Sequence, residues 1–322
     1  MKDKISLLFI LISFFSIFFF QKQILINTKI LLFISEQFPI PLKPLGLVTS
    51  SPIHKEIEFD SKNGKIVADL FVPSGEQKPA VILAMGVKTA EKDKPLLISL
   101  GKTLARLNYI VLWPRLEKLD KQEAYPEEPE TFIKSFEYLE NLKEVNKERV
   151  SFAGFSVGSS IALTAAEDKR IAEKTRSLVF FGGYYDIFDY LKSLESKTSK
   201  INGKTTSWKP NEGTNHINEI LQNLGISSIE SALKSPELKK YNPSEDLENF
   251  KAKIFILHDK NDSYVHYFEG EKLNKSLEGK VEKEFLIVDL FEHVQPKKLL
   301  TIETFGELKK LYGFLYKVLD YL

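Results

Sequence analysis

The sequence has 322 residues, of which 43% are hydrophobic, so it is long enough to bury the core of one large α/β domain. The 45 Lys and Arg side chains balance the 44 Asp and Glu side chains, and the formal charge of +1 gives no electrostatic reason to expect nucleic acid as a partner. The chain contains no cysteine, which excludes a thiolate nucleophile, a disulfide framework and a thiolate metal site.

The first feature along the chain is the uncharged apolar run "ISLLFILISFFSIFFF" at residues 5–20. It is apolar all round, which favours a membrane segment over a buried core helix. No small-residue cleavage site follows it, so we expect residues 1–34 to be a retained anchor, with the cleaved signal segment of a secreted protein as the alternative. We expect the rest of the protein to lie on the extracytoplasmic side, although the lysines on the two sides of the run are balanced and orient it weakly.

A proline-rich stretch follows at residues 35–53. Its four prolines disfavour a regular helix or a central strand. We therefore predict a linker here, followed by one domain over residues 54–322.

From residue 54 the sequence alternates between strand and helix patterns. Short runs that are wholly apolar are typical of strands buried on both faces of a parallel sheet, which needs crossover helices between its strands. We predict a hairpin at 54–60 and 65–73, strands at 80–86, 109–114 and 149–154, and helices at 95–107 and 129–144. The fold class is therefore α/β, with a mostly parallel, doubly wound sheet flanked by helices.

The motif Gly154-Phe155-Ser156-Val157-Gly158 lies where the strand at 149–154 gives way to a helix. A G-x-S-x-G pentapeptide between a strand and a helix is typical of a serine raised on a sharp turn as a nucleophile. The alternative is an ordinary serine that caps the helix N-terminus.

This arrangement resembles the α/β-hydrolase fold, in particular its bacterial dienelactone-hydrolase-like branch, over about residues 54–318. The resemblance implies a triad in the chain order Ser, acid, His. The segment "AKIFILHDKNDSYVHY" at 252–267 is similar to the strand and turn that carry the acid in this family, with Asp262 at the acid position. Asp259, and Asp186 after the preceding strand, remain alternatives.

His293 follows the strand-like run at 282–289 and resembles the histidine of the family. A serine hydroxyl needs such an imidazole to accept its proton and later to protonate the leaving group. Among the five histidines, His293 has both the chain order and the loop position of a general base, whereas His258 at the end of the acid strand is expected to support the loop.

The resemblance also implies an oxyanion hole made by backbone N–H groups. These would be the N–H of Val157, directly after the nucleophile, and that of Val87 in the loop after the strand at 80–86. We expect no cofactor and no metal.

Residues 184–250 form a segment longer than a crossover needs, which we predict to be a lid inserted before the acid strand. We expect helices in it at about 216–224 and 227–234. Its aromatic residues would line a substrate pocket or pack the lid on the core: Trp208, Tyr184, Tyr185 and Phe188.

The sequence thus predicts a membrane-anchored serine hydrolase that cleaves small-molecule carboxylic esters through an acyl-enzyme. A peptidase, a thioesterase or an acyltransferase would use the same triad. A non-catalytic binding protein on this fold is the alternative of a different class.

Overall fold

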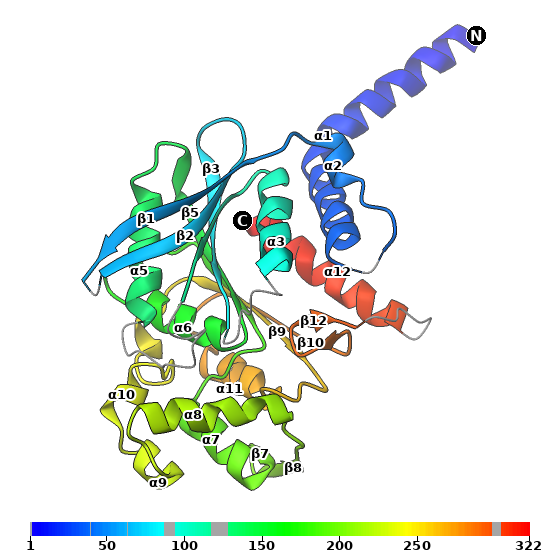
Figure 1. The fold of residues 1–322 in the computed structure, drawn as a ribbon. Coiled ribbons are helices and arrows are strands. Elements are labelled where there is room, and N and C mark those ends of the chain that lie inside the picture. Colours follow the sequence, from blue (N-terminus) through cyan, green and yellow to red (C-terminus); the bar gives the residue numbers. More distant parts are fainter. Residues whose placement is uncertain (1, 39, 63, 87–93, 117–127, 298–303) are drawn as a thin grey trace.

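The computed structural model describes residues 1–322 except 1, 39, 63, 87–93, 117–127 and 298–303, and it describes the backbone alone for 2–19, 215, 216, 219 and 220. The centre of the molecule is an eight-stranded sheet in the order β1-β2-β4-β3-β5-β6-β9-β10 (Figure 1). Strand β2 runs antiparallel to β1 and β4, and every other neighbouring pair in this sheet is parallel. The strands are β1 Ile53–Ser61, β2 Gly64–Val72, β3 Lys78–Ala84, β4 Ile110–Pro114, β5 Val145–Phe155, β6 Ser177–Phe181, β9 Lys253–Asp259 and β10 Lys283–Val288.

Helices cover both faces of the sheet, as the predicted α/β class requires (Figure 1). One face carries the helices α5 Glu128–Glu140, α6 Val157–Ala166 and α11 Phe268–Ser276. The other face carries α1 Lys2–Gln37, α3 Lys94–Arg106 and α12 Thr304–Tyr321. Each layer buries its own apolar cluster against the sheet.

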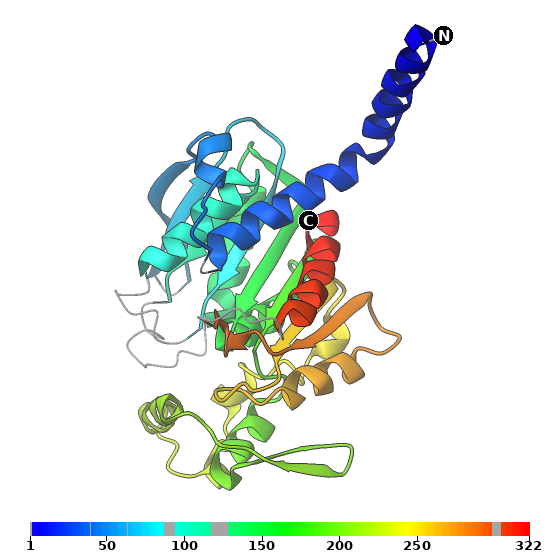
Figure 2. The same ribbon diagram turned by 90° about the vertical axis from the view of Figure 1, so that its right-hand side faces the viewer.

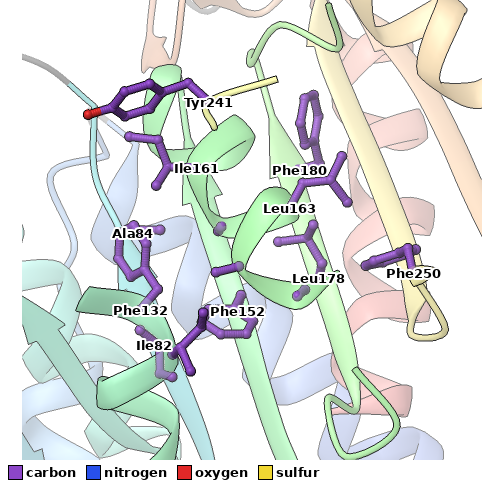
Figure 3. Packing of buried hydrophobic residues seen from close by; sticks show 14 of the residues in the cluster. Ile82, Ala84, Phe132, Phe152, Ile161, Leu163, Leu178, Phe180, Tyr241 and Phe250 are labelled. Carbon is purple, nitrogen blue, oxygen red and sulfur yellow. The ribbon is translucent and has the colours of Figure 1, made fainter. Parts of the chain in front are cut away.

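The cluster under α5 and α6 is held by large side chains that have no exposed surface. Phe132 and Phe136 of α5 lie against Phe152 of β5, with ring centroids 6.4 Å and 6.1 Å apart. Figure 3 shows Phe132 and Phe152 in this cluster. A change of one such phenylalanine to alanine typically costs about 3–5 kcal/mol. The turn that follows β5 is therefore supported by a closely packed, fully buried cluster.

The residues between β6 and β9 form a separate layer beyond one end of the sheet (Figures 1 and 2). We call residues 184–250 the insertion. The predicted helices correspond to α8 His216–Asn223 and to the shorter α9 Ile229–Ala232. The insertion also contains elements that the sequence did not predict, namely α7 Ile187–Ser196, the hairpin β7 Thr198–Ile201 and β8 Lys204–Ser207, η1 Glu212–Asn215, α10 Pro236–Lys239 and η2 Leu247–Asn249.

Helix α1 extends beyond the segment 1–34, and its C-terminal half packs on the domain. Ile26 and Ile30 are 4% and 0% exposed, and Asn27 accepts a hydrogen bond from the Tyr312 hydroxyl of α12 at 2.6 Å. The stretch 35–53 includes a four-residue helix, α2 Leu45–Val48, between Pro44 and Thr49. Prolines therefore leave room for one short turn of helix in the predicted linker.

The N-terminal half of α1 projects away from the body of the protein, toward the side opposite the insertion (Figures 1 and 2). Where side chains are described, no helix combines the length and the apolar character needed to cross a membrane. The apolar run 5–20 lies almost wholly in the part of α1 that is described by its backbone alone.

Candidate active site

Ser156 occupies the sharp turn between β5 and α6. Its backbone has φ 55° and ψ −140°, a conformation that non-glycine residues adopt rarely and at a cost. Its N–H donates to the Phe181 carbonyl of the neighbouring strand β6 at 2.8 Å, which helps to hold the turn. The Ser156 side chain makes no capping hydrogen bond to α6, so the geometry does not match an ordinary helix cap.

Two glycines of the motif permit this turn because their neighbours leave no room for a side chain. A Cβ at Gly154 would lie 2.4 Å from the Cα of Ser159, and one at Gly158 would lie 2.3 Å from the Ala84 carbonyl oxygen at the end of β3. The same close packing exists at Gly86, where a Cβ would lie 2.9 Å from the Cβ of Ser156. The end of β3, the turn and α6 are therefore in direct contact around the serine.

Asp262 and His293 form a direct pair. The distance from Asp262 Oδ2 to His293 Nδ1 is 2.7 Å, and Asp262 is only 3% exposed. Burial opposes ionisation of Asp262, but the positive charge of protonated His293 and hydrogen bonds from His258 and His293 outweigh it and hold the pKa of this carboxyl well below its usual range. The other oxygen, Oδ1, accepts the N–H groups of Tyr264 and Val265 at 2.8 and 2.9 Å. This carboxylate can therefore orient the imidazole and stabilise its charged form.

His293 lies in the loop between β11 Phe291–Glu292 and β12 Gln295–Pro296 and has a positive φ of 60°. Its Nε2 is buried and has no hydrogen-bond partner among the residues that the structure describes, so it forms no hydrogen bond with Ser156 in this conformation. Such bonds are often loose before substrate binds.

The position of Gly182 shows that the serine and this pair are close in space. It directly follows Phe181, whose carbonyl accepts the Ser156 N–H, and a Cβ at Gly182 would lie 3.5 Å from both His293 Cε1 and Asp262 Oδ2. Ser156, Asp262 and His293 thus lie together at the carboxyl ends of β5, β6 and β9, where parallel sheets bind their ligands.

The two other candidate acids have different partners. Asp259 Oδ2 accepts the N–H groups of Leu290 and Phe291 at 2.9 and 2.8 Å, and burial raises the pKa of this carboxyl. Asp259 therefore fixes the backbone that leads to His293, whereas Asp262 contacts the imidazole itself. Asp186 caps α7 by accepting the N–H groups of Phe188 and Asp189.

His258 is completely buried beside the acid. Its Nε2 lies 2.9 Å from the Val265 carbonyl and 3.4 Å from Asp262 Oδ2. This places it as a support of the turn, in the way the sequence suggested.

His266 follows the same turn. Burial and the neighbouring charge of His258 lower the pKa of His266 to about 4, and His266 Nδ1 accepts the Phe268 N–H.

The N–H of Val157 stands at the N-terminus of α6, where the helix dipole favours negative charge. Val87 lies outside the described residues, directly after Gly86.

The four aromatic candidates of the insertion serve packing. Trp208 and Tyr184 are buried, at 8% and 2% exposed, and belong to the apolar core cluster, while Tyr185 and Phe188 pack against it.

A cavity of about 470 Å³ lies elsewhere, at the amino ends of β6 and β9, and is lined by charged side chains that include Arg176 and Lys253. Ligand sites of parallel sheets lie at the opposite ends of the strands, so we assign this cavity no part in the site.

No model of a protein family matches the sequence, and no curated protein matches it. Solved structures do match. A dipeptidyl peptidase 4 from Porphyromonas gingivalis aligns over 85% of this chain and 36% of its own, with a TM-score of 0.59 at 12% identity. An acylaminoacyl peptidase from Pyrococcus horikoshii aligns over 85% of this chain and 42% of its own, with a TM-score of 0.58 at 12% identity. A 2,6-dihydroxy-pseudo-oxynicotine hydrolase aligns over 83% and 68%, with a TM-score of 0.58 at 14% identity.

The chain thus spans about two fifths of the length of the two peptidases. Identities this low establish a shared fold and leave activity open. The sheet order, the helices on both faces and these structural matches agree with the resemblance seen in the sequence, and the chain has the α/β-hydrolase fold.

Proposed function

We propose that the protein is a serine hydrolase in which Ser156 is the nucleophile, His293 the general base and Asp262 the acid of the triad. The observation that carries this proposal is the Asp262–His293 pair: His293 Nε2 has no partner among the described residues and is buried at the same end of the sheet as the strained turn of Ser156. A buried imidazole nitrogen without a hydrogen-bond partner costs folding free energy, so such an atom calls for a functional explanation. Acceptance of the proton of a nucleophilic serine is one such function.

In this mechanism Ser156 Oγ bonds to the carbonyl carbon of the substrate while its proton passes to His293 Nε2. The negative charge that develops on the carbonyl oxygen is stabilised by hydrogen bonds from the N–H group of Val157 and, by the family resemblance, from that of Val87. His293 then protonates the leaving group, the bond to that group breaks, and an acyl-Ser156 ester remains. Water repeats the sequence with His293 as base and releases the acid.

We propose carboxylic esters as the substrates and take amides as the second candidate, because the solved structures described above include peptidases. Purified full-length protein should be assayed with matched p-nitrophenyl esters and aminoacyl p-nitroanilides, with Ser156→Ala as the control. Ester turnover that depends on Ser156, with anilide turnover at least tenfold lower, would support the ester reading. The reverse ratio would replace it with the peptidase reading. The same panel extends to thioesters and to added alcohol acceptors, which would reveal a thioesterase or an acyltransferase.

We further propose that residues 5–20 attach the protein to a membrane. Supporting this, Phe20, Ile24 and Leu31 are 57%, 49% and 61% exposed and lie on one side of α1, away from the docked Ile26 and Ile30. The apolar run therefore continues as an exposed apolar stripe on the packed half of the helix.

The absence of cysteine permits a direct test, because each single-cysteine variant can be labelled at one position. A polarity-sensitive dye should be quenched by brominated lipids at Ile24→Cys in vesicles, and should not be quenched at Lys209→Cys in the insertion. Full-length protein that stays free of vesicles would contradict the attachment.

A further inference from the structure

The insertion contacts the backbone of the turn that carries Asp262. We call residues 259–265 the acid turn. Three successive carbonyl oxygens of this turn each accept a hydrogen bond from the insertion: Asp262 from the Trp208 indole N–H at 3.0 Å, Ser263 from the Asn211 N–H at 2.7 Å, and Tyr264 from the Tyr190 hydroxyl at 2.8 Å.

Two of these donors come from well-buried positions in different elements. Tyr190 belongs to α7 and is 5% exposed, and Trp208 directly follows β8 and is 8% exposed. Inside a protein such bonds are shielded from water, and a buried carbonyl that loses its donor is left with an unmet hydrogen bond. The position of the acid turn therefore depends on the insertion as well as on β9.

The same turn carries the side chain that faces the imidazole. Tyr264 stacks on His293 with ring centroids 4.9 Å apart. Gly213 of η1 also packs closely on Tyr264, since a Cβ there would lie 3.0 Å from the Tyr264 ring and hydroxyl. In the described part of the chain, the charged and titratable groups found beside His293 are Asp262, with His258 behind it, and the Tyr264 phenol. The insertion thus reaches His293 through both Asp262 and Tyr264.

We propose that the insertion holds the triad in its working geometry, with Tyr190 and Trp208 as positioning residues that act through the acid turn. This role goes beyond that of a cover over the substrate, and it rests on the proposed serine hydrolase function. A small displacement of the acid turn would lengthen the bond between Asp262 and His293, and misplaced catalytic groups react slowly even when every group is present.

The chain contains a matched control for Tyr190. Tyr184 is also buried, its ring stacks on that of Tyr190 with centroids 5.6 Å apart, and its hydroxyl also donates to a backbone carbonyl. Its acceptor is Tyr241 at 3.1 Å, which belongs to the insertion and not to the acid turn. Tyr190→Phe and Tyr184→Phe therefore each remove one buried hydroxyl donor, and only the first releases the acid turn.

The experiment compares the rate constant of labelling by a fluorophosphonate probe, together with the melting temperature, in the full-length parent and both variants. We expect Tyr190→Phe to lower the labelling rate roughly 5-fold, as for the net loss of one buried hydrogen bond, and Tyr184→Phe to change it less than about 2-fold. Both variants should lower the melting temperature to a similar degree. In an Asp262→Asn background, Tyr190→Phe should lower the rate by less than it does in the parent, because part of its effect passes through Asp262.

Equal labelling rates for Tyr190→Phe and Tyr184→Phe, with a labelled parent, would overturn this inference and leave the proposed function intact. Additive losses in the Asp262→Asn background would also overturn it. A folded parent that is never labelled would instead overturn the proposed function, and this inference with it.

Discussion

The ring of Tyr264 stacks on the imidazole of His293, with an angle of 29° between the two planes. An aromatic face beside an imidazole favours the protonated ring through its negative quadrupole. In the proposed mechanism the imidazole becomes charged when it accepts the serine proton, so this contact would stabilise the step that forms the acyl-enzyme.

Tyr264→Leu should therefore lower the probe-labelling rate by about 3- to 10-fold, and Tyr264→Phe, which keeps the ring, should stay within about 2-fold of the parent. A labelling rate of Tyr264→Leu within about 2-fold of the parent would show that the stacking does not assist the reaction.

Asp262 and Asp259 should respond differently to the same substitution. Asp262→Asn places an amide beside His293 Nδ1 and should lower the labelling rate by about 10³- to 10⁴-fold, as for loss of the acid in serine triads. Asp259→Asn places a donor against backbone N–H groups of Asn261, Leu290 or Phe291. It should cost about 1–3 kcal/mol of stability with a much smaller loss of rate. A larger loss of rate for Asp259→Asn would reassign the acid.

Gly158→Ala should damage the turn of Ser156. The added methyl would lie 2.3 Å from the Ala84 carbonyl and 2.4 Å from that of Met85, so β3 and α6 would have to separate. We expect a loss of roughly 1–3 kcal/mol or more in unfolding free energy, as for overpacking, together with loss of labelling. The control is Gly313→Ala in α12, where no described atom beyond the neighbouring helix backbone lies within 4 Å of the added Cβ and alanine should stabilise the helix by up to about 1 kcal/mol. Equal melting temperatures for the two variants would contradict the packing described at Gly158.

Lys29 makes the docking of α1 sensitive to pH. Its Nζ lies 4.5 Å from the centre of the Tyr109 ring, and burial, with the charges of Arg149 and Lys78, lowers the pKa of Lys29 from 10.5 to about 8. Between these two values Lys29 binds more protons in the unfolded chain than in the folded chain, so its contribution to the free energy of unfolding should rise as the pH rises from about 8 to about 10.5.

Lys29→Met keeps the packing of the stem and removes the buried charge. It should stabilise the full-length protein in detergent micelles by about 1–2 kcal/mol at pH 7, and this advantage should shrink above pH 8. The control is Lys22→Met, whose side chain is 67% exposed and pairs with Asp320, and which should have an effect below about 1 kcal/mol at either pH. A parent and a Lys29→Met variant with the same pH dependence of melting would contradict this account.

The sheet was predictable from the sequence because its parallel strands are short, wholly apolar runs such as "AVILAMG". The turn of Ser156 was predictable because the two motif glycines mark a place without room for a Cβ. The pairing of Asp262 with His293 followed from the family resemblance and not from any local pattern, since these residues lie 31 positions apart.

The structure of the insertion was harder to predict, because its elements are stabilised by contacts with distant segments. Helix α7 did have a local signal: Asp186 precedes an apolar run and caps the helix, although in the sequence it was a candidate acid. The hydrogen bonds from Tyr190 and Trp208 to the acid turn join residues 74 and 54 positions apart, and no spacing rule predicts them.

The docking of α1 was missed for a related reason. In the sequence, Ile26 and Ile30 look like a continuation of the apolar run. No sequence pattern indicates that α1 packs against α12 and α3, where these side chains are buried. For this reason the central experiment should use the full-length chain.

The most direct test of the account is fluorophosphonate labelling of the full-length protein and of its Ser156→Ala and His293→Ala variants, with exposed Ser227→Ala as the control. The account predicts labelling of the parent and of Ser227→Ala, and its loss in the Ser156 and His293 variants. Absence of labelling in a folded parent, or labelling that persists in Ser156→Ala, would contradict it.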